Sequence, residues 1–440
     1  EIARVSLGAG AWTDAERWAR EASASERGYA ADMTLAEALH LQGRPVESME
    51  VFGELPADLR GDTRALEMYG QLSAARNQHL RGVRTFQQAI DLGSSKPGEL
   101  WFWTGVSALE REDFASAATA LDRARASGEL PALVEDARDR LDRQSSPIVS
   151  VPGRIFGDSN NLSLRETGVR GKLWPSLRVP IVGEVVAGEV SQNDARFTRQ
   201  RAVAGVGDVF VTPALTLATE AGAERYERGS LFVGRGTVTF LREDTSFVSL
   251  DAHRETFWTA HDARNPREFN RVIDLAGLGS DMPVTGFKGT ANTVLAPNRR
   301  LLVEGGADRY GDDNTRGFAY GHYELVTMAR QDRWMAFAPN LYWESYRRES
   351  PFYFSPSSYV ALGGLLHTIR STPAWRVELE ANPAATWYRS DLGFAAHGVV
   401  DVARTWGRAT LGGGVFFFYD QRARYGSYRI VAQFDWRLGR

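Results

Sequence analysis

The sequence predicts an α + transmembrane β fold, in which N-terminal α-helical repeats precede a C-terminal antiparallel outer-membrane β-barrel of about 16 strands. Residues 1 to about 145 carry apolar side chains at helical spacing, in units that recur every 34 or 35 residues. From about residue 160 the apolar period becomes two, over segments longer than a usual globular strand. We therefore expect a helical domain over 1–145, a linker over 146–160 and a barrel over 161–440.

The composition excludes several classes of function. A chain of 440 residues is too long for one ordinary domain, and its net charge of −3 argues against a nucleic-acid partner. Cysteine is absent, which excludes disulfides, thiolate metal sites and cysteine nucleophiles. The sequence has no apolar run of the ~18 residues that indicate a transmembrane helix.

Small residues recur at fixed positions in the helical part. They allow paired helices to approach, while large residues fill the space between neighbouring pairs. The pattern resembles the tetratricopeptide repeat, and its best copy is LWFWTGVSALEREDFASAATALDRA, residues 100–124. The first residues fit the second half of an earlier repeat, so we expect the array to continue N-terminally. The signature positions are Gly70, Gly82, Ala89, Trp101, Gly105, Ala117 and Ala124.

The alternating part divides into sixteen candidate strands, which match or exceed the ~9–11 residues that a tilted strand needs to cross a bilayer. They are 161–173, 177–190, 197–209, 212–225, 229–242, 244–257, 270–281, 285–296, 299–310, 315–329, 333–346, 357–369, 373–388, 391–404, 407–420 and 424–438. Short connectors between many of them indicate antiparallel neighbours. The long connectors 258–269 and 347–356 follow an even and an odd strand, so either the count is displaced by one strand or one long connector lies on the opposite side.

The stretch WRVELEANPAATWY, residues 375–388, indicates which face of a strand is wet. One alternate set is apolar and includes Leu379, and it begins and ends with tryptophan. We expect this set to face lipid and the polar set to face water. Pro383 removes one ladder donor, so we expect a bulge or a local break there. Aromatic residues near other strand ends suggest membrane-interface girdles: Trp174, Phe257, Trp258, Trp343, Trp375, Trp387, Trp406 and Trp436.

Charged side chains in the middle of the polar faces favour a water-filled lumen over the core of a soluble sandwich. Burying such carboxylates in a dry core costs several kcal/mol each unless they are paired. The resulting candidates for a lumen or substrate path are Asp251, Glu255, Glu304, Arg376, Glu378, Glu380, Asn382, Asp401 and Asp435. An acidic lumen would suit neutral or partly cationic sugars. The alternative is that each carboxylate pairs with an arginine on the next strand.

Catalytic motifs are absent from the sequence, which has no His-Glu-x-x-His, no Gly-x-Ser-x-Gly and no P-loop. His397 and Asp401 lie four residues apart on one strand face, ~13 Å at the usual rise, which is too far for direct partnership. We expect no enzymatic activity, no cofactor and no metal site.

Two short segments carry a family resemblance. The first is SPFYFSPSSYVALGG, with Tyr353, Phe354, Ser355 and Pro356. The second is FGDSNNLSLRETGVRG, with Asp158 and Ser159. Together with repeats followed by a barrel, they resemble the outer-membrane export porins with tetratricopeptide repeats that secrete exopolysaccharides, such as the cellulose synthase C family. Two features depart from that family: only about three and a half repeats are present, and the chain ends in FDWRLGR rather than in an aromatic residue.

The resemblance implies a passive conduit in the bacterial outer membrane, with the repeats in the periplasm. Its implied partners are a polysaccharide chain, outer-membrane lipid, and periplasmic or inner-membrane synthase components that dock on the repeats. Two alternatives stay open. A translocator of surface lipoproteins would have about fourteen strands, and a receptor or adhesin would have a plugged pore.

Overall fold

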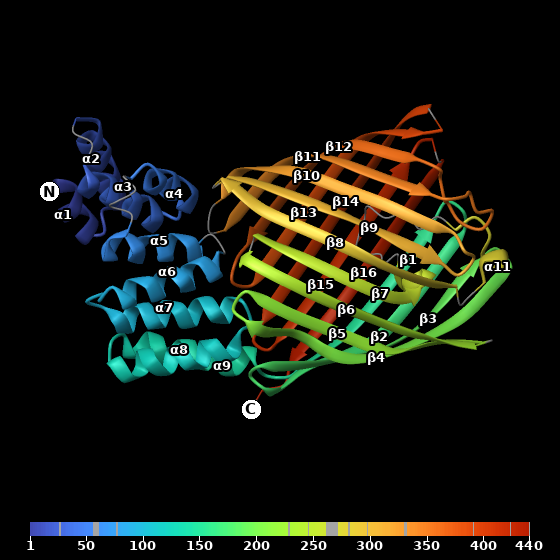
Figure 1. Cartoon of the computed structure of the whole chain (residues 1–440), viewed down its shortest axis with the longest axis horizontal. Helices are drawn as coiled ribbons and strands as arrows, with labels where there is room; N and C mark the ends of the chain where they lie inside the picture. The colour runs from blue at the N-terminus through green and yellow to red at the C-terminus, as the bar shows by residue number, and fades with distance from the viewer. Residues whose placement is uncertain are drawn as a thin grey trace.

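The computed structural model describes residues 1–25, 28–55, 61–75, 78–227, 229–244, 246–260, 272–279, 282–296, 298–329, 332–389, 391–422 and 424–439. A helical domain stands at one open end of a long barrel, and the C-terminus lies at that same end (Figure 1). We call this the helix end of the barrel, and the opposite mouth the far end. No helix among the described residues is both long and apolar enough to cross a bilayer.

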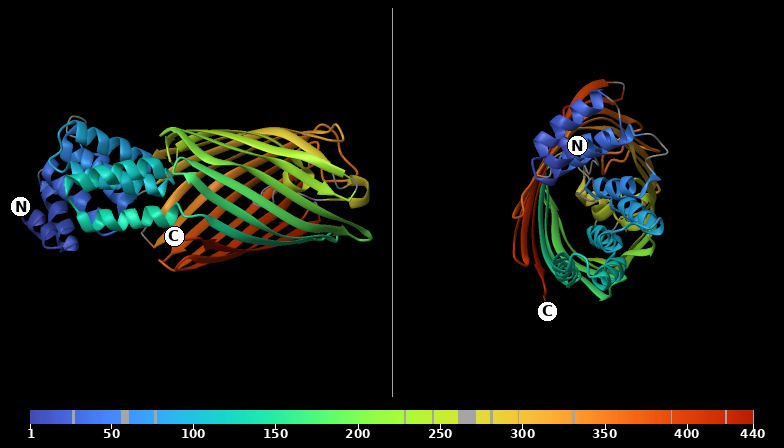
Figure 2. Two further views of the ribbon diagram at one scale, coloured as in Figure 1. Left: turned by 90° about the horizontal axis from the view of Figure 1, so that it is seen from below. Right: turned by 90° about the vertical axis from the view of Figure 1, so that its left-hand side faces the viewer.

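The N-terminal domain is a series of antiparallel helices that follows an arc around the barrel mouth (Figure 2). Proline occupies the first turn of three of them, where its missing N–H is not needed. The helices are α1 (Ile2–Gly8), α2 (Trp12–Ser25), α3 (Tyr29–Leu41), α4 (Pro45–Gly53), α5 (Thr63–Ala75), α6 (His79–Asp91), α7 (Pro97–Glu110), α8 (Phe114–Ser127) and α9 (Pro131–Gln144).

Glycines at the predicted signature positions lie where neighbouring helices touch. A Cβ on Gly70 of α5 would lie 2.4 Å from the ring of Phe86 on α6, and one on Gly105 of α7 would lie 2.7 Å from Leu121 on α8. Ala89, Ala117 and Ala124 are fully buried, Gly82 lies against the Gly70 carbonyl, and Trp101 stacks on Arg123. These contacts explain the spacing, while membership of the tetratricopeptide family stays a prediction.

Sixteen antiparallel strands close into a barrel in sequence order, with the first paired to the last. The predicted fold class is confirmed. The strands are β1 (Ile148–Asp158), β2 (Leu162–Ser176), β3 (Val179–Gln192), β4 (Ala195–Thr212), β5 (Leu215–Tyr226), β6 (Gly229–Glu243), β7 (Ser246–Thr256), β8 (Pro283–Ala296), β9 (Arg299–Tyr310), β10 (Thr315–Ala329), β11 (Arg333–Tyr346), β12 (Tyr359–Ser371), β13 (Trp375–Tyr388), β14 (Asp391–Trp406), β15 (Ala409–Asp420) and β16 (Tyr425–Arg437).

Two of the predicted boundaries are wrong, and the two errors cancel in the strand count. β1 lies inside the predicted linker 146–160, and the barrel therefore begins before residue 161. The predicted strand 270–281 does not form: Leu275–Leu278 is the short helix α11, while residues 270, 271, 280 and 281 lie outside the described residues. With this correction both long connectors, 257–282 and 347–358, follow odd strands, and their described residues lie at the far end (Figure 1).

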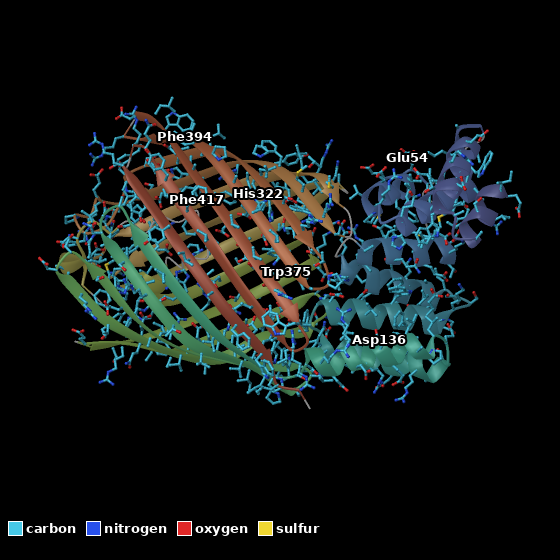
Figure 3. All side chains as sticks on the ribbon, turned by 180° about the vertical axis from the view of Figure 1, so that it is seen from behind. Glu54, Asp136, His322, Trp375, Phe394 and Phe417 are labelled. Carbon is cyan, nitrogen blue, oxygen red and sulfur yellow. The ribbon has the colours of Figure 1, made fainter. Side chains whose placement is uncertain are left out.

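The outer surface of the barrel is apolar, and the inner wall carries the polar side chains. On β13, Leu379 is 42% exposed on the outer face, whereas Asn382 on the inner face is 6% exposed. Figure 3 shows Trp375, Phe394 and Phe417 along β13, β14 and β15, and all three are exposed. This confirms the predicted alternation of residues 375–388, since the apolar set faces outward and the polar set faces inward.

Pro383 and three of the predicted girdle aromatics show how local sequence modifies this pattern. At Pro383 the ladder between β12 and β13 is interrupted without a shift in register, so the local break is found and the bulge is not. Trp343, Trp375, Trp387, Trp406 and Trp436 are exposed on the outer face. Phe257 and Trp258 are instead buried at the far end, and Trp174 packs edge-on against Phe114 of the helical domain.

Candidate functional site: the barrel interior

The inner wall from β1 to β5 carries a chain of ion pairs. Arg199 of β4 is 3% exposed and contacts Glu166 through Nη1 and Glu224 through Nε, both at 3.1 Å. Glu166 also pairs with Arg154 of β1, and Arg201 pairs with Glu220 at 3.1 Å. Charges with several opposite partners are stabilised on a partly desolvated wall, where an isolated charge would be costly.

A second chain of charges continues from β6 to β11. Arg235 contacts Asp251 at 3.3 Å and Glu255 at 3.4 Å. His253 lies 3.3 Å from Asp308 of β9, which in turn contacts Arg316 of β10 at 3.3 Å. Arg316 then reaches Glu344 of β11 at 3.1 Å and donates to the Tyr342 hydroxyl at 2.9 Å.

Several of these contacts join side chains on two strands that are separated by a third strand. They are possible because the residue between them on the third strand is a glycine, which has no side chain. Gly188 of β3 is the ladder partner of both Glu166 and Arg199. Gly286 of β8 is the ladder partner of both His253 and Asp308, and a Cβ there would lie 2.1 Å from Asp308 Oδ1. The absence of a side chain therefore lets residues two strands apart meet.

An inward-facing glycine also allows two asparagines on separate strands to contact each other. Asn340 of β11 donates through Nδ2 to Asn382 Oδ1 of β13 at 3.0 Å, passing over Gly363 of β12. Asn382 also lies 3.4 Å from Nδ1 of His397 on β14. Asn382 is thus buried in an amide–imidazole row, and its contact with a polymer stays a prediction.

The carboxylates predicted to line the lumen divide into paired and unpaired groups. Asp251 and Glu255 share Arg235, and Glu304 lies 3.7 Å from Lys288. Asp251 and Glu255 therefore follow the predicted alternative of pairing with an arginine on the next strand, whereas the cation beside Glu304 is a lysine. Asp401 forms no ion pair with the described residues, and Asp435 accepts a hydrogen bond from Gln433 at 2.7 Å.

A cavity of about 750 Å³ occupies the interior between these strands. Glu255, Asp401 and Asp435 line it, together with residues of the first ion-pair chain. The cavity wall thus combines ion pairs with two carboxylates, Asp401 and Asp435, that have no ion-pair partner among the described residues.

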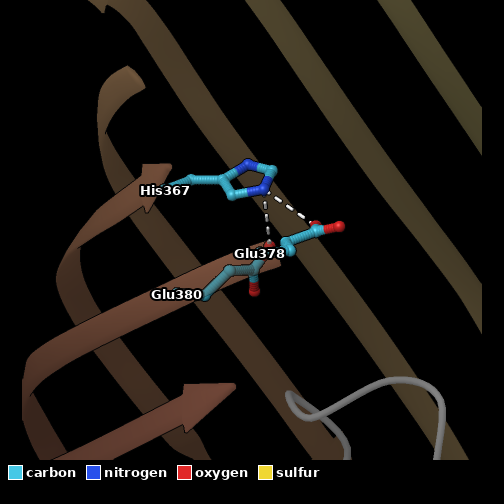
Figure 4. Close-up of side chains that lie close together, drawn as sticks. All are labelled: His367, Glu378 and Glu380. Carbon is cyan, nitrogen blue, oxygen red and sulfur yellow. Dashed lines mark hydrogen bonds and ion pairs between the residues drawn. The ribbon is translucent and has the colours of Figure 1, made fainter. Parts of the chain in front are cut away.

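Near the helix end, the predicted candidates of β13 meet a histidine that sequence analysis did not select. His367 of β12 lies 2.8 Å from Glu378 and 3.7 Å from Glu380 (Figure 4). Arg376 holds the other oxygen of Glu378 at 2.5 Å. Four charged or titratable groups from two neighbouring strands are therefore brought together.

Two long connectors fold over the inner wall at the far end. Phe257, Trp258 and Leu275 of the first pack with Leu162, Tyr226 and Tyr310 of the strands. Tyr353 of the second is 1% exposed and stacks on Tyr310 with ring centroids 5.3 Å apart. Its neighbour Phe354 enters a separate aromatic cluster with Tyr342, Tyr359 and Tyr425.

The two motifs that carry the family resemblance meet at this far end. Asp158 accepts from the backbone N–H of Asn160, and the Asn160 side chain donates to the carbonyl of Val272 at 3.1 Å. Val272 forms a β-bridge with Tyr353. Sequence analysis missed Gln192, which bonds to both Val272 and Leu275, because nothing in its local sequence indicates that a distant connector contacts it.

At the helix end, Arg111 after α7 joins the helical domain to the barrel rim. Its Nε lies 2.6 Å from Asp244, and its Nη2 donates to the Pro213 carbonyl at 2.7 Å. A cavity of about 770 Å³ lies beside this contact, lined by His79, Trp174 and Asp208 among others. Burial lowers the pKa of His79 below its ordinary value, so its imidazole is neutral at pH 7.

Sequence analysis also missed the buried arginines Arg199, Arg201 and Arg316 as functional candidates. The period-two alternation of the strands could have identified them, because each arginine belongs to the alternate set of residues that faces inward. Sequence analysis selected mainly carboxylates, and Arg376 was its only arginine, although Arg199, Arg201 and Arg316 form the ion pairs of the wall.

No family model matches this chain, and no curated protein matches it in sequence. A structure described as a bacterial polysaccharide outer membrane secretin aligns with a TM-score of 0.54 and 12% identity, over 67% of this chain and 99% of that one. OmpT, an outer membrane protein of Vibrio cholerae folded in vitro, gives a TM-score of 0.35 and 8% identity, over 66% of this chain and 96% of that one. OprD of Pseudomonas aeruginosa gives 0.34 and 7%, over 66% of this chain and 94% of that one.

The last two scores are too low to support any argument, and the first supports a likeness of fold. This chain has a 16-stranded β-barrel of the bacterial outer-membrane type, similar to that of the polysaccharide secretin and preceded by a helical region.

Proposed function

We propose that this protein is a passive conduit that exports an exopolysaccharide through the outer membrane. The observation that carries the proposal is the hollow barrel interior, where ion-paired walls surround a cavity of about 750 Å³ and the outer face is apolar. A barrel of sixteen strands leaves an aqueous channel rather than a core filled by side chains. Conduction of a polymer needs no catalytic group, and we propose no enzymatic role.

The orientation follows from the connectors. Outer-membrane barrels have short periplasmic turns and longer extracellular loops. The long connectors 257–282 and 347–358 lie at the far end, whereas the turns at the helix end are short. The helical domain would therefore stand in the periplasm, where its arc around the barrel mouth suits guidance of a polymer or docking of the synthase machinery.

The carboxylates without an arginine partner suggest the class of glycan. Asp401 and Asp435 add acidic side chains to the cavity wall and have no arginine partner among the described residues. A wall of this sign disfavours a strongly anionic polymer and favours a neutral or partly cationic one. The specific sugar, including cellulose, is a matter for experiment.

The strand count disfavours a lipoprotein translocator, for which about fourteen strands are expected. A plugged receptor or adhesin is the second candidate, because described residues of two connectors pack against the inner wall at the far end in a large, partly aromatic cluster. Conductance separates the two functions, since a receptor needs no continuous path for ions.

The experiment measures the full chain in planar bilayers. We expect ion conductance that rises when 347–358 is shortened, and transient block by a neutral glucan oligosaccharide and by one that contains glucosamine. Block by an anionic uronate oligosaccharide should be weaker. A barrel that stays silent after the connector is shortened would overturn the export proposal and favour the receptor.

A further inference from the structure

Three metal-ligating side chains converge on the inner wall near the helix end. Figure 4 shows His367 of β12 directed at Glu378 and Glu380 of β13. His367 Nε2 lies 2.8 Å from Glu378 Oε1 and 3.7 Å from Glu380 Oε1. One ligand atom from each residue lies within 4.8 Å of the other two.

The sheet holds this triangle in place. Glu378 and Glu380 are two residues apart, so both face inward, and His367 is the ladder partner of Glu380. Each side chain is about one-fifth exposed, which leaves an approach from the lumen. The ring of Trp334 packs edge-on against the imidazole with centroids 4.8 Å apart and limits its rotation.

The surrounding charges favour a further cation. Glu378 faces Asp401 across the ladder with β14, and Asp401 forms no ion pair with the described residues. Arg376 contacts only one oxygen of Glu378, the Oε2 atom, and leaves Oε1 directed at His367. Among described residues, the ion pair of Glu380 is with His367, at 3.7 Å.

We propose that His367, Glu378 and Glu380 bind a divalent transition-metal ion, with Zn²⁺ the best match. Imidazole nitrogen and carboxylate oxygen are both ordinary zinc ligands, and three protein ligands leave a position for water. A nitrogen ligand makes Ca²⁺ and Mg²⁺ poorer occupants, because both prefer oxygen alone. Sequence analysis predicted no metal site. The three ligands are divided between β12 and β13, so no known short metal-binding motif contains them.

Zinc binding is measurable without any transport assay. The test titrates Zn²⁺ alone into the full chain in detergent micelles, with any purification tag removed, and follows the heat of binding. We expect one saturable site that Mg²⁺ does not fill. His367→Gln and Glu380→Gln should each weaken binding at least about ten-fold, as the loss of a ligand or of its support typically does.

The matched control is Asp435→Asn, which removes an inward carboxylate near the same end of the barrel but outside the cluster. It should bind Zn²⁺ as the unaltered chain does. Heat-modifiable gel mobility checks that each variant forms a barrel. Absence of saturable binding at millimolar Zn²⁺, or equal affinity in His367→Gln, overturns the proposal and leaves the cluster as an ion-pair network only.

A second readout places the ion in the lumen. Zn²⁺ added on the helix side should reduce the conductance of the unaltered chain more than that of His367→Gln. Because the titration does not depend on a conducting barrel, failure of zinc binding and failure of the export proposal are distinguishable.

Discussion

Single inward-facing glycines determine which side chains can meet on the barrel wall. Gly188 and Gly286 each stand between two charged partners that belong to the flanking strands. A side chain at either position would separate a buried charge from its partner. The sequence shows only a glycine in a strand, and its purpose becomes visible once the register is known.

Gly286→Ala should destabilise the barrel by about 1–3 kcal/mol, because overpacking costs that much in a filled interior. The new Cβ would lie 2.1 Å from Asp308 Oδ1 and 2.7 Å from the Ala307 carbonyl oxygen. Urea unfolding in lipid vesicles measures the change. Gly236→Ala is the control, since a Cβ there meets nothing within 4 Å; equal losses in the two variants would refute this role for Gly286.

Substitutions of two adjacent residues on β13 test which face of the strand contacts lipid and which faces the lumen. Leu379→Arg should impair barrel assembly by about 2–4 kcal/mol if the position lies near the bilayer midplane, and by less towards the interface. Glu380→Gln should leave folding intact and alter ion selectivity, because Glu380 faces the lumen. Unfolding in vesicles and reversal potentials measure these outcomes. Exchange of the two results would mean that inside and outside are reversed.

At the scale of elements, the helical domain and the barrel are joined by specific polar contacts at the rim. The side chain of Arg111 is 5% exposed, stacks on Phe210 with 4.8 Å to the ring centroid, and pairs with Asp244. The Arg84 guanidinium donates to the Arg242 carbonyl at 2.9 Å, on the rim turn that carries Asp244. Such contacts fix the domain over one part of the mouth.

Arg111→Ala should weaken docking of the helical domain by about 1.5–3 kcal/mol, because the partly buried Asp244 loses its ion-pair partner and keeps the hydrogen bond from the Leu80 backbone N–H. Limited proteolysis at 145–147, between α9 and β1, should become faster. Arg125→Ala is the matched control, since its pair with Glu135 is more than half exposed and contributes little. Unchanged cleavage in Arg111→Ala would show that other contacts hold the domains together.

The elements themselves show what sequence can predict. Period-two alternation correctly predicted most strands and the polar face of β13. This works because successive side chains of a strand point to opposite faces, so the local sequence alone shows which residues share a face. β1 was missed because Pro152 and Gly153 indicate a linker, although closure against β16 overrides that local signal. Contacts such as His367 with Glu378 could not be predicted, since they depend on the register between strands.

At the scale of the whole molecule, the helical arc and the barrel follow one another along one axis (Figure 2), and two connectors pack against the inner wall at the far end. The central claim is that the ring of strands is closed, with lipid outside and water inside. A closed ring leaves no strand edge unpaired in the membrane. The pairing of β1 with β16 supplies that closure.

The most direct test is cysteine accessibility on β13, since the chain has no cysteine of its own. Single cysteines replace residues 376 to 381 in turn, and each protein in lipid vesicles is treated with a charged, membrane-impermeant thiol reagent. The account predicts labelling at 376, 378 and 380 and protection at 377, 379 and 381. Equal labelling at all six positions, or the opposite alternation, would contradict it.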